Sequence, residues 1–249
     1  MLPASRRRLR IEVLIVSGLS LGQSAVYSVV QLLDKLSRAP LAEGTSTLNA
    51  SRNSREYFDL TYQMLDIVFA LVPVALVLYL LGSSGKSPFR TVGFDLRRPG
   101  KDALHGAGLA VLIGIPSLGL YAAGRALGIT TAIIPSALDA YWWTIPVLIL
   151  SAIRHGIVEE VIVVGYLMDR FGKFGWRTPV AIVVSAALRG SYHLYQGFGP
   201  FVGNFVMGLV FAWLYTRTRR VMPLVIAHAI LDTFAFVGFS LFGRLVGLG

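Results

Sequence analysis

The sequence predicts an all-α polytopic membrane protein with about seven transmembrane helices, its N-terminus inside and its C-terminus outside. Of its 249 residues, 55% are apolar and only 14% are charged, whereas soluble domains carry about 25% charged residues. Seven apolar stretches approach the roughly 20 residues that a membrane span needs. Basic residues gather between these stretches, which is how membrane proteins set their orientation. We therefore expect lipid contact and no nucleic-acid partner, despite a formal net charge of +10.

The first half of the chain is predicted to form N-terminal membrane helices, residues 1–139, with an outer loop at about 34–61. Residues 140–243 form the expected catalytic core of the same integral membrane unit. Four arginines precede the first span, which is too long for a signal peptide and lacks a cleavage site, so we expect it to be retained. The expected spans are 11–33, 62–82, 102–123, 143–168, 178–197, 199–216 and 221–243.

Basic residues decide the orientation. With the N-terminus inside, 15 of the 23 Lys and Arg residues fall in inner segments and 6 in outer segments. This bias follows the positive-inside rule and requires an odd number of spans when the C-terminus lies outside. We expect the plasma membrane of a bacterial cell. The absence of cysteine excludes a disulfide scaffold and a Cys-based zinc or redox site.

Ionisable residues inside the later spans are the specific functional signal. Each charge near the bilayer centre costs on the order of 2.5–3.5 kcal/mol, so these side chains must face inward and pair, or line a wet cavity. On ideal helices His155 and Glu159 share one face, as do Arg189 and His193, and His228 and Asp232. The candidate residues are Arg154, His155, Glu159, Glu160, Arg189, His193, His228 and Asp232.

These residue types support hydrolysis of a peptide bond. Desolvation raises the pKa of a buried carboxyl group, which suits Glu159 to deprotonate a water held with His155 and His193. His228, oriented by Asp232, can stabilise an oxyanion. Arg154 is expected to be a structural counter-charge for Glu160. At about 1.5 Å per residue, Glu159 would lie roughly 14 Å and His193 roughly 22 Å from the inner edge of the membrane. The fifth helix must therefore be strongly tilted or begin shallow for His193 to reach Glu159.

The same residues are also compatible with a divalent metal such as zinc, with Glu159, His193 and His228 as candidate ligands and an open position for water. The H-E-x-x-H helix of soluble metalloproteases is absent. The residues alone leave open whether a cofactor is needed.

Residues 140–240 resemble the CPBP intramembrane proteases, a family that includes the CAAX prenyl endopeptidases and the bacterial Abi-type proteins. The resemblance rests on Glu159-Glu160, on a histidine 34 residues later and on a final H-x-x-x-D, with Gly165-Tyr166-Leu167 after the first motif. It implies that Glu159 is the catalytic base and Glu160 a supporting acid. It also implies that His193 positions the water, and that His228 with Asp232 forms the oxyanion or ligand pair.

Two positions depart from the family motifs E-E-x-x-x-R and F-x-x-x-H, because Val164 replaces the arginine and Arg189 replaces the phenylalanine. We hypothesise that Arg189 supplies from the fifth helix the charge that position 164 no longer supplies. The expected function is an intramembrane endopeptidase, of the glutamic or the metallo type, acting on a membrane-anchored or hydrophobic peptide.

Two other functions remain open at this stage. The departures at Val164 and Arg189 are also compatible with a catalytically silent scaffold or an immunity-type protein that binds a peptide. A proton-coupled transporter would need polar residues along a path to both faces, and the outer halves of the spans are too apolar for that.

Overall fold

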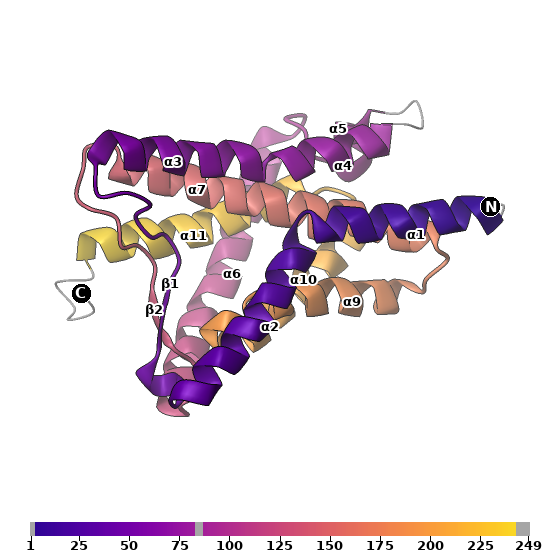
Figure 1. Ribbon diagram of the computed structural model, residues 1–249. Helices are drawn as coiled ribbons and strands as arrows, with labels where there is room; N and C mark the ends of the chain where they lie inside the picture. Colours follow the sequence, from indigo (N-terminus) through magenta and orange to yellow (C-terminus); the bar gives the residue numbers. More distant parts are fainter. Residues whose placement is uncertain (1–2, 83–86, 243–249) are drawn as a thin grey trace.

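The computed structural model describes residues 3–82 and 87–242, which are mostly helical (Figure 1). Up to residue 134, the elements are α1 (Pro3–Gly18), α2 (Leu21–Arg38), η1 (Leu41–Glu43), β1 (Thr45–Thr47), α3 (Glu56–Ala70), α4 (Val72–Gly82), α5 (Pro88–Val92), α6 (Pro99–Ala126) and β2 (Ala132–Ile134). After it, they are α7 (Thr144–Glu159), η2 (Glu160–Tyr166), α8 (Leu167–Lys173), α9 (Thr178–Ser191), η3 (Leu194–Gln196), α10 (Phe198–Thr218) and α11 (Met222–Phe242).

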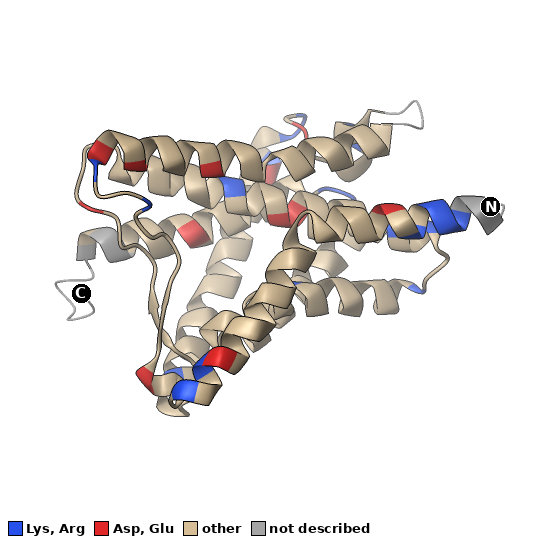
Figure 2. Cartoon of the chain, in the orientation of Figure 1, with Lys and Arg blue, Asp and Glu red and all other residues tan. Residues whose placement is uncertain are grey.

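Three helical stretches of the described chain are long and apolar enough to cross a membrane: Glu56–Gly82, Pro99–Ala126 and Phe198–Thr218. Helices α1 and α2 make a fourth if they are one span, bent by 54°. Figure 2 shows the basic residues near the start of α1 and long uncharged stretches along α6 and α9. The described parts of the predicted spans lie mostly on helices, with breaks at residues 19–20 and 192–193, while the number of seven crossings and the orientation stay predictions.

The connection between the first two predicted spans is shorter than 34–61. Helix α2 continues to Arg38 and α3 begins at Glu56. Between them, β1 pairs in parallel with β2, with Ser46 opposite Ile133. The Lys35 ammonium donates to the carbonyls of Thr45 at 2.9 Å and Tyr195 at 2.7 Å. A strand of three residues is too short to give a hydropathy pattern. Its partner strand lies almost ninety residues later, so the pairing is a tertiary contact.

The predicted fifth span, 178–197, is not one continuous helix. Helix α9 ends at Ser191, and the chain turns through Tyr192 and His193 into the 3₁₀ turn η3. Gly197 then has φ +108°, a conformation that favours glycine, and α10 begins at Phe198. The break itself carries polar residues and glycine between two apolar helices, so the apolar flanks led to the prediction of one span across it.

Close packing between α7 and α11 sets the site. These two helices pack extensively together, as do α9 with α10 and α6 with α11. At Gly156 of α7, an added Cβ would lie 2.8 Å from the carbonyl oxygen of Val225 and 3.5 Å from the Cβ of His228. The missing side chain therefore allows α11 to approach α7 just before the two glutamates.

Candidate active site

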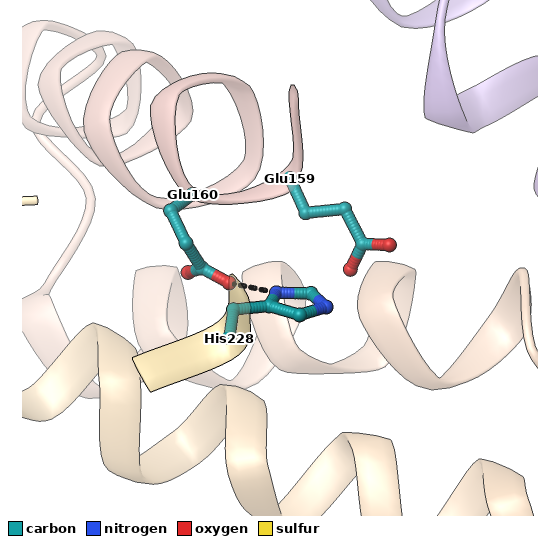
Figure 3. Close-up of side chains that lie close together, drawn as sticks. All are labelled: Glu159, Glu160 and His228. Carbon is teal, nitrogen blue, oxygen red and sulfur yellow. Dashed lines mark hydrogen bonds and ion pairs between the residues drawn. The ribbon is translucent and has the colours of Figure 1, made fainter. Parts of the chain in front are cut away.

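The two glutamates lie where a regular helix changes its winding. Glu159 is the last residue of α7, and Glu160 is the first of the π-helical segment η2. Such wide turns occur frequently at functional sites. The hydroxyl of Ser185 on α9 donates to the carbonyl of Val163 at 2.7 Å, which satisfies one backbone acceptor of this turn. Figure 3 shows both carboxylates pointing toward the His228 ring.

Glu160 is the fully buried member of the pair. Its Oε1 faces Nδ1 of His228 at 2.7 Å and also accepts a hydrogen bond from Nη2 of Arg189. The side chains of Glu160 and Arg189 have no exposed surface. Because an unpaired buried charge is costly, each of these groups depends on the other. The charge opposite Glu160 is thus supplied by Arg189, whereas Val164 lies fully buried in the main apolar cluster.

Glu159 has different partners. Its Oε2 accepts a hydrogen bond from the Tyr192 hydroxyl at 2.6 Å, and Nη1 of Arg189 lies 3.7 Å from the same oxygen. Tyr192 is buried and was not among the residues expected from the sequence. The sequence offered one signal for it, because Tyr192 carries a hydroxyl group and directly precedes the candidate His193. Glu159 is therefore held through one oxygen, by a neutral donor and a more distant cation.

His193 reaches the site from a turn, not from the middle of a helix. Its Nδ1 lies 3.3 Å from Nε2 of Gln196, and its Nε2 is buried with no hydrogen-bond partner among the described residues. The neighbouring Tyr192 contacts Glu159. Helix α9 thus ends early and brings residues 192–193 close to Glu159 at the end of α7. A tilted fifth helix is therefore not needed for His193 to reach the site.

Asp232 lies between two histidines. Its Oδ2 is 3.4 Å from Nδ1 of His155 and 3.6 Å from Nε2 of His228. His155 was expected to help Glu159 hold water, but its carboxylate neighbour is Asp232. His228 was expected to be oriented by Asp232, yet its shorter contact is with Glu160. Both ring nitrogens of His228 therefore face carboxylates on different helices.

Arg154 does not neutralise Glu160, contrary to expectation. Its Nη2 donates to the Ser151 hydroxyl at 3.2 Å, and its Nε is buried with no partner among the described residues. Arg154 and Glu160 are six positions apart, so their side chains leave the helix on different sides. Among the described residues, Arg154 forms no ion pair within 4.0 Å with either of the two glutamates.

The atoms that could hold a metal ion differ from the expected set. Glu159, Glu160 and His228 each offer a ligand atom, and these three atoms lie within 4.8 Å of one another. The expected set had His193 in place of Glu160. However, one Glu160 oxygen is already engaged by the Arg189 guanidinium, so a divalent cation there would lie beside a fixed positive charge.

Residues 141–234 match the family model described as "Type II CAAX prenyl endopeptidase Rce1-like". This segment is Rce1-like. The match covers less than half of the chain, and it contains all eight candidate residues. No curated protein and no solved structure matches the chain.

The Rce1-like segment agrees with the resemblance to the CPBP and CAAX proteases, and it implies a protease. Together with the long apolar helices, it indicates an integral membrane protein. The matched residues run from just before α7 into α11, which are the elements that build the site.

Proposed function

We propose that the protein is a glutamate-dependent intramembrane endopeptidase that cleaves a membrane-anchored or hydrophobic peptide. The observation that carries this proposal is the division between the two glutamates. Each glutamate has one oxygen outside the contacts described above, but Glu160 is fully buried and its charge is paired with Arg189 and His228, so its free Oε2 is enclosed. Glu159 is 5% exposed and keeps one oxygen outside the Tyr192 hydrogen bond. A general base needs such an oxygen within reach of a water molecule.

In the proposed reaction, Glu159 takes a proton from a water molecule whose oxygen attacks the carbonyl carbon of the scissile peptide bond. The tetrahedral intermediate carries a negative oxygen, which N–H groups of His193 or His228 stabilise. Its carbon–nitrogen bond then breaks, and Glu159 delivers the proton to the leaving amine. The products are a carboxylic acid and an amine, and Glu159 returns to its ionised form.

The second carboxylate and its partners position these groups. Glu160 fixes the ring of His228 through Nδ1, so Nε2 is the nitrogen directed at Asp232 and the remaining space. Arg189 supplies the compensating charge that allows two adjacent glutamates to be ionised together. A reaction without a metal is the simpler assignment, because the guanidinium already supplies positive charge between the carboxylates.

The test compares newly formed peptide N-termini in membranes of cells that express wild type, Glu159→Gln or Glu43→Gln at matched levels. Glu43 is exposed and distant in sequence from the site, so its variant controls for expression and for loss of a carboxylate. We expect termini that are present with wild type and Glu43→Gln and absent with Glu159→Gln. Identical profiles for all three proteins, with Glu159→Gln folded, would overturn the proposal and favour the silent scaffold.

A further inference from the structure

We propose that Arg154 binds a carboxylate group of the substrate, and so selects peptides with a free carboxylate near the scissile bond. This inference rests on the proposed function, whose site it extends. It starts from a cation in a largely apolar helix that has no anion of its own. The step to a ligand comes from comparing Arg154 with the other shielded arginines.

Three of the other arginines shielded from solvent in the described chain have a carboxylate within ion-pair distance, and the fourth, Arg125, donates to the backbone carbonyls of Ala42 at 2.9 Å and Thr130 at 2.7 Å. Arg170 lies 2.7 Å from Glu12, Arg189 pairs with Glu160, and Arg220 lies 2.5 Å from Asp102. Arg154 is half-buried, yet no carboxylate oxygen among the described residues lies within 4.0 Å of its guanidinium. Its neutral partner is the Ser151 hydroxyl, and its Nε has none.

The carboxylates that interact electrostatically with Arg154 have other partners. Arg154 interacts electrostatically with Glu159, Asp232 and Asp66. Asp66 forms an ion pair with Arg52 at 2.5 Å, and Asp232 faces His155 and His228. Glu159 accepts a hydrogen bond from Tyr192 through Oε2, and in the proposed function its other oxygen faces the reacting water. A guanidinium that is partly buried in an apolar helix without an ion-pair partner is unfavourable, and a bound anion would relieve this cost.

Arg154 is also held in place. The Ser151 hydroxyl donates a hydrogen bond to Oδ1 of Asn49 at 3.2 Å, and Nδ2 of Asn49 donates to the Pro135 carbonyl at 2.8 Å. Residues 49 and 135 belong to the paired segments that extend β1 and β2. The guanidinium is therefore anchored on the side of α7 that faces these segments, one turn before Glu159, with Nε and Nη groups left to form a fork to a carboxylate.

The probe is an apolar hexapeptide with an N-terminal dansyl group, prepared as the free acid, as the C-terminal amide and as an amide with one internal glutamate. Binding is measured by fluorescence in detergent micelles with the Glu159→Gln protein, which leaves the peptide intact. We expect the free acid to bind about 10- to 100-fold more tightly than the plain amide, as for other charge-assisted hydrogen bonds. If the internal glutamate restores binding, the carboxylate source is a side chain. If it does not, the source is the chain terminus.

Adding Arg154→Gln should remove this preference, so that the free acid and the plain amide bind alike, and Arg154→Lys should retain part of it. Arg217→Gln, at an exposed arginine that stacks on Trp213, is the matched control and should retain all of it. A preference that survives Arg154→Gln, or an equal loss for both peptides, overturns the inference. So does a failure of every peptide to bind. Cleavage by wild type without a carboxylate preference would refute this inference alone, and carboxylate-dependent binding without cleavage would refute the proposed function alone.

Discussion

Arg189 on α9 and His228 on α11 meet at a single oxygen of Glu160, in a cluster where none of the three side chains is more than 5% exposed. This oxygen joins three segments that are far apart in sequence. The contact ties the winding change at the end of α7 to both neighbouring helices, so the cluster has a structural role as well as a chemical one.

Replacement of Arg189 should therefore affect folding and activity together. Arg189→Ala leaves Glu160 buried beside a histidine alone, and breaking such a pair costs about 3–5 kcal/mol. We expect a clearly lower melting temperature in detergent and loss of peptide cleavage. Arg189→Lys keeps the charge without the planar fork and should retain part of both. Wild-type cleavage by Arg189→Ala would contradict the role given to this residue.

The Val164 position offers a companion test. If Arg189 replaces a charge that relatives carry at position 164, adding Val164→Arg to Arg189→Ala should restore some activity. We expect only partial recovery, because Val164 is fully buried in the main apolar cluster and an arginine there must displace apolar contacts. Cleavage and melting temperature of the single and double variants separate these effects. No recovery in a folded double variant would contradict the exchange.

Replacing each of the two glutamates by glutamine should have different effects on stability. Glu159→Gln should abolish cleavage with little loss of stability, because its partners are one hydroxyl and a cation 3.7 Å away. Glu160→Gln should lower the melting temperature as well, because it removes the charge that compensates Arg189. Thermal unfolding and cleavage of the same samples give the comparison. Equal stability losses in the two variants would contradict the division of roles.

Tyr192 should matter through its hydroxyl. Tyr192→Phe keeps the ring and removes the hydrogen bond to Glu159. Hydrogen bonds to charged groups contribute about 1.5–3 kcal/mol, so we expect kcat to fall about 10- to 100-fold while the peptide KM changes little. Steady-state kinetics on one peptide measure this, with Tyr195→Phe, three residues along the same turn, as control. An unchanged kcat would remove Tyr192 from the site.

The cost of burying charge singled out ionisable residues in apolar segments, and the structure brings Glu159, Glu160, Arg189, His228 and Asp232 into contact with one another. Their catalytic roles stay predictions. Helical spacing then assigned the wrong neighbours to His155 and Arg154, because spacing along one helix does not report which helix packs opposite. The helix break at Tyr192 escaped notice because residues 178–197 were treated as one span, although Gly190, Ser191 and Gln196 interrupt the apolar sequence. These contacts depend on packing at Gly156 and on the winding of η2, which no local pattern encodes.

Metal removal provides a separate test of the chemistry. With Arg189 already placed between the carboxylates, we expect cleavage by the purified protein to be unchanged after treatment with EDTA or 1,10-phenanthroline. The comparison is the initial rate before and after chelation, followed by re-addition of zinc. Loss of activity that zinc restores would assign the Glu159, Glu160 and His228 atoms to a metal and would replace the metal-free mechanism.

The packing of α7 on α11 should control the catalytic geometry without any change in charge. Gly156→Ala places a Cβ about 2.8 Å from the backbone oxygen of Val225, so the two helices must separate. Overpacking of this kind costs about 1–3 kcal/mol. The separation should also lengthen the contact between Glu160 and His228, which lie just beyond this crossing.

We therefore expect Gly156→Ala to lower both the melting temperature and kcat, although it touches no ionisable group. Gly119→Ala is the control, because Gly119 lies within α6 and an added Cβ there meets no atom within 4 Å. Alanine in the interior of a helix stabilises by up to about 1 kcal/mol relative to glycine, so this variant should be neutral or slightly more stable, with normal cleavage. If Gly156→Ala cleaves peptide at the wild-type rate, the close approach of α7 and α11 does not set the position of His228 relative to Glu160.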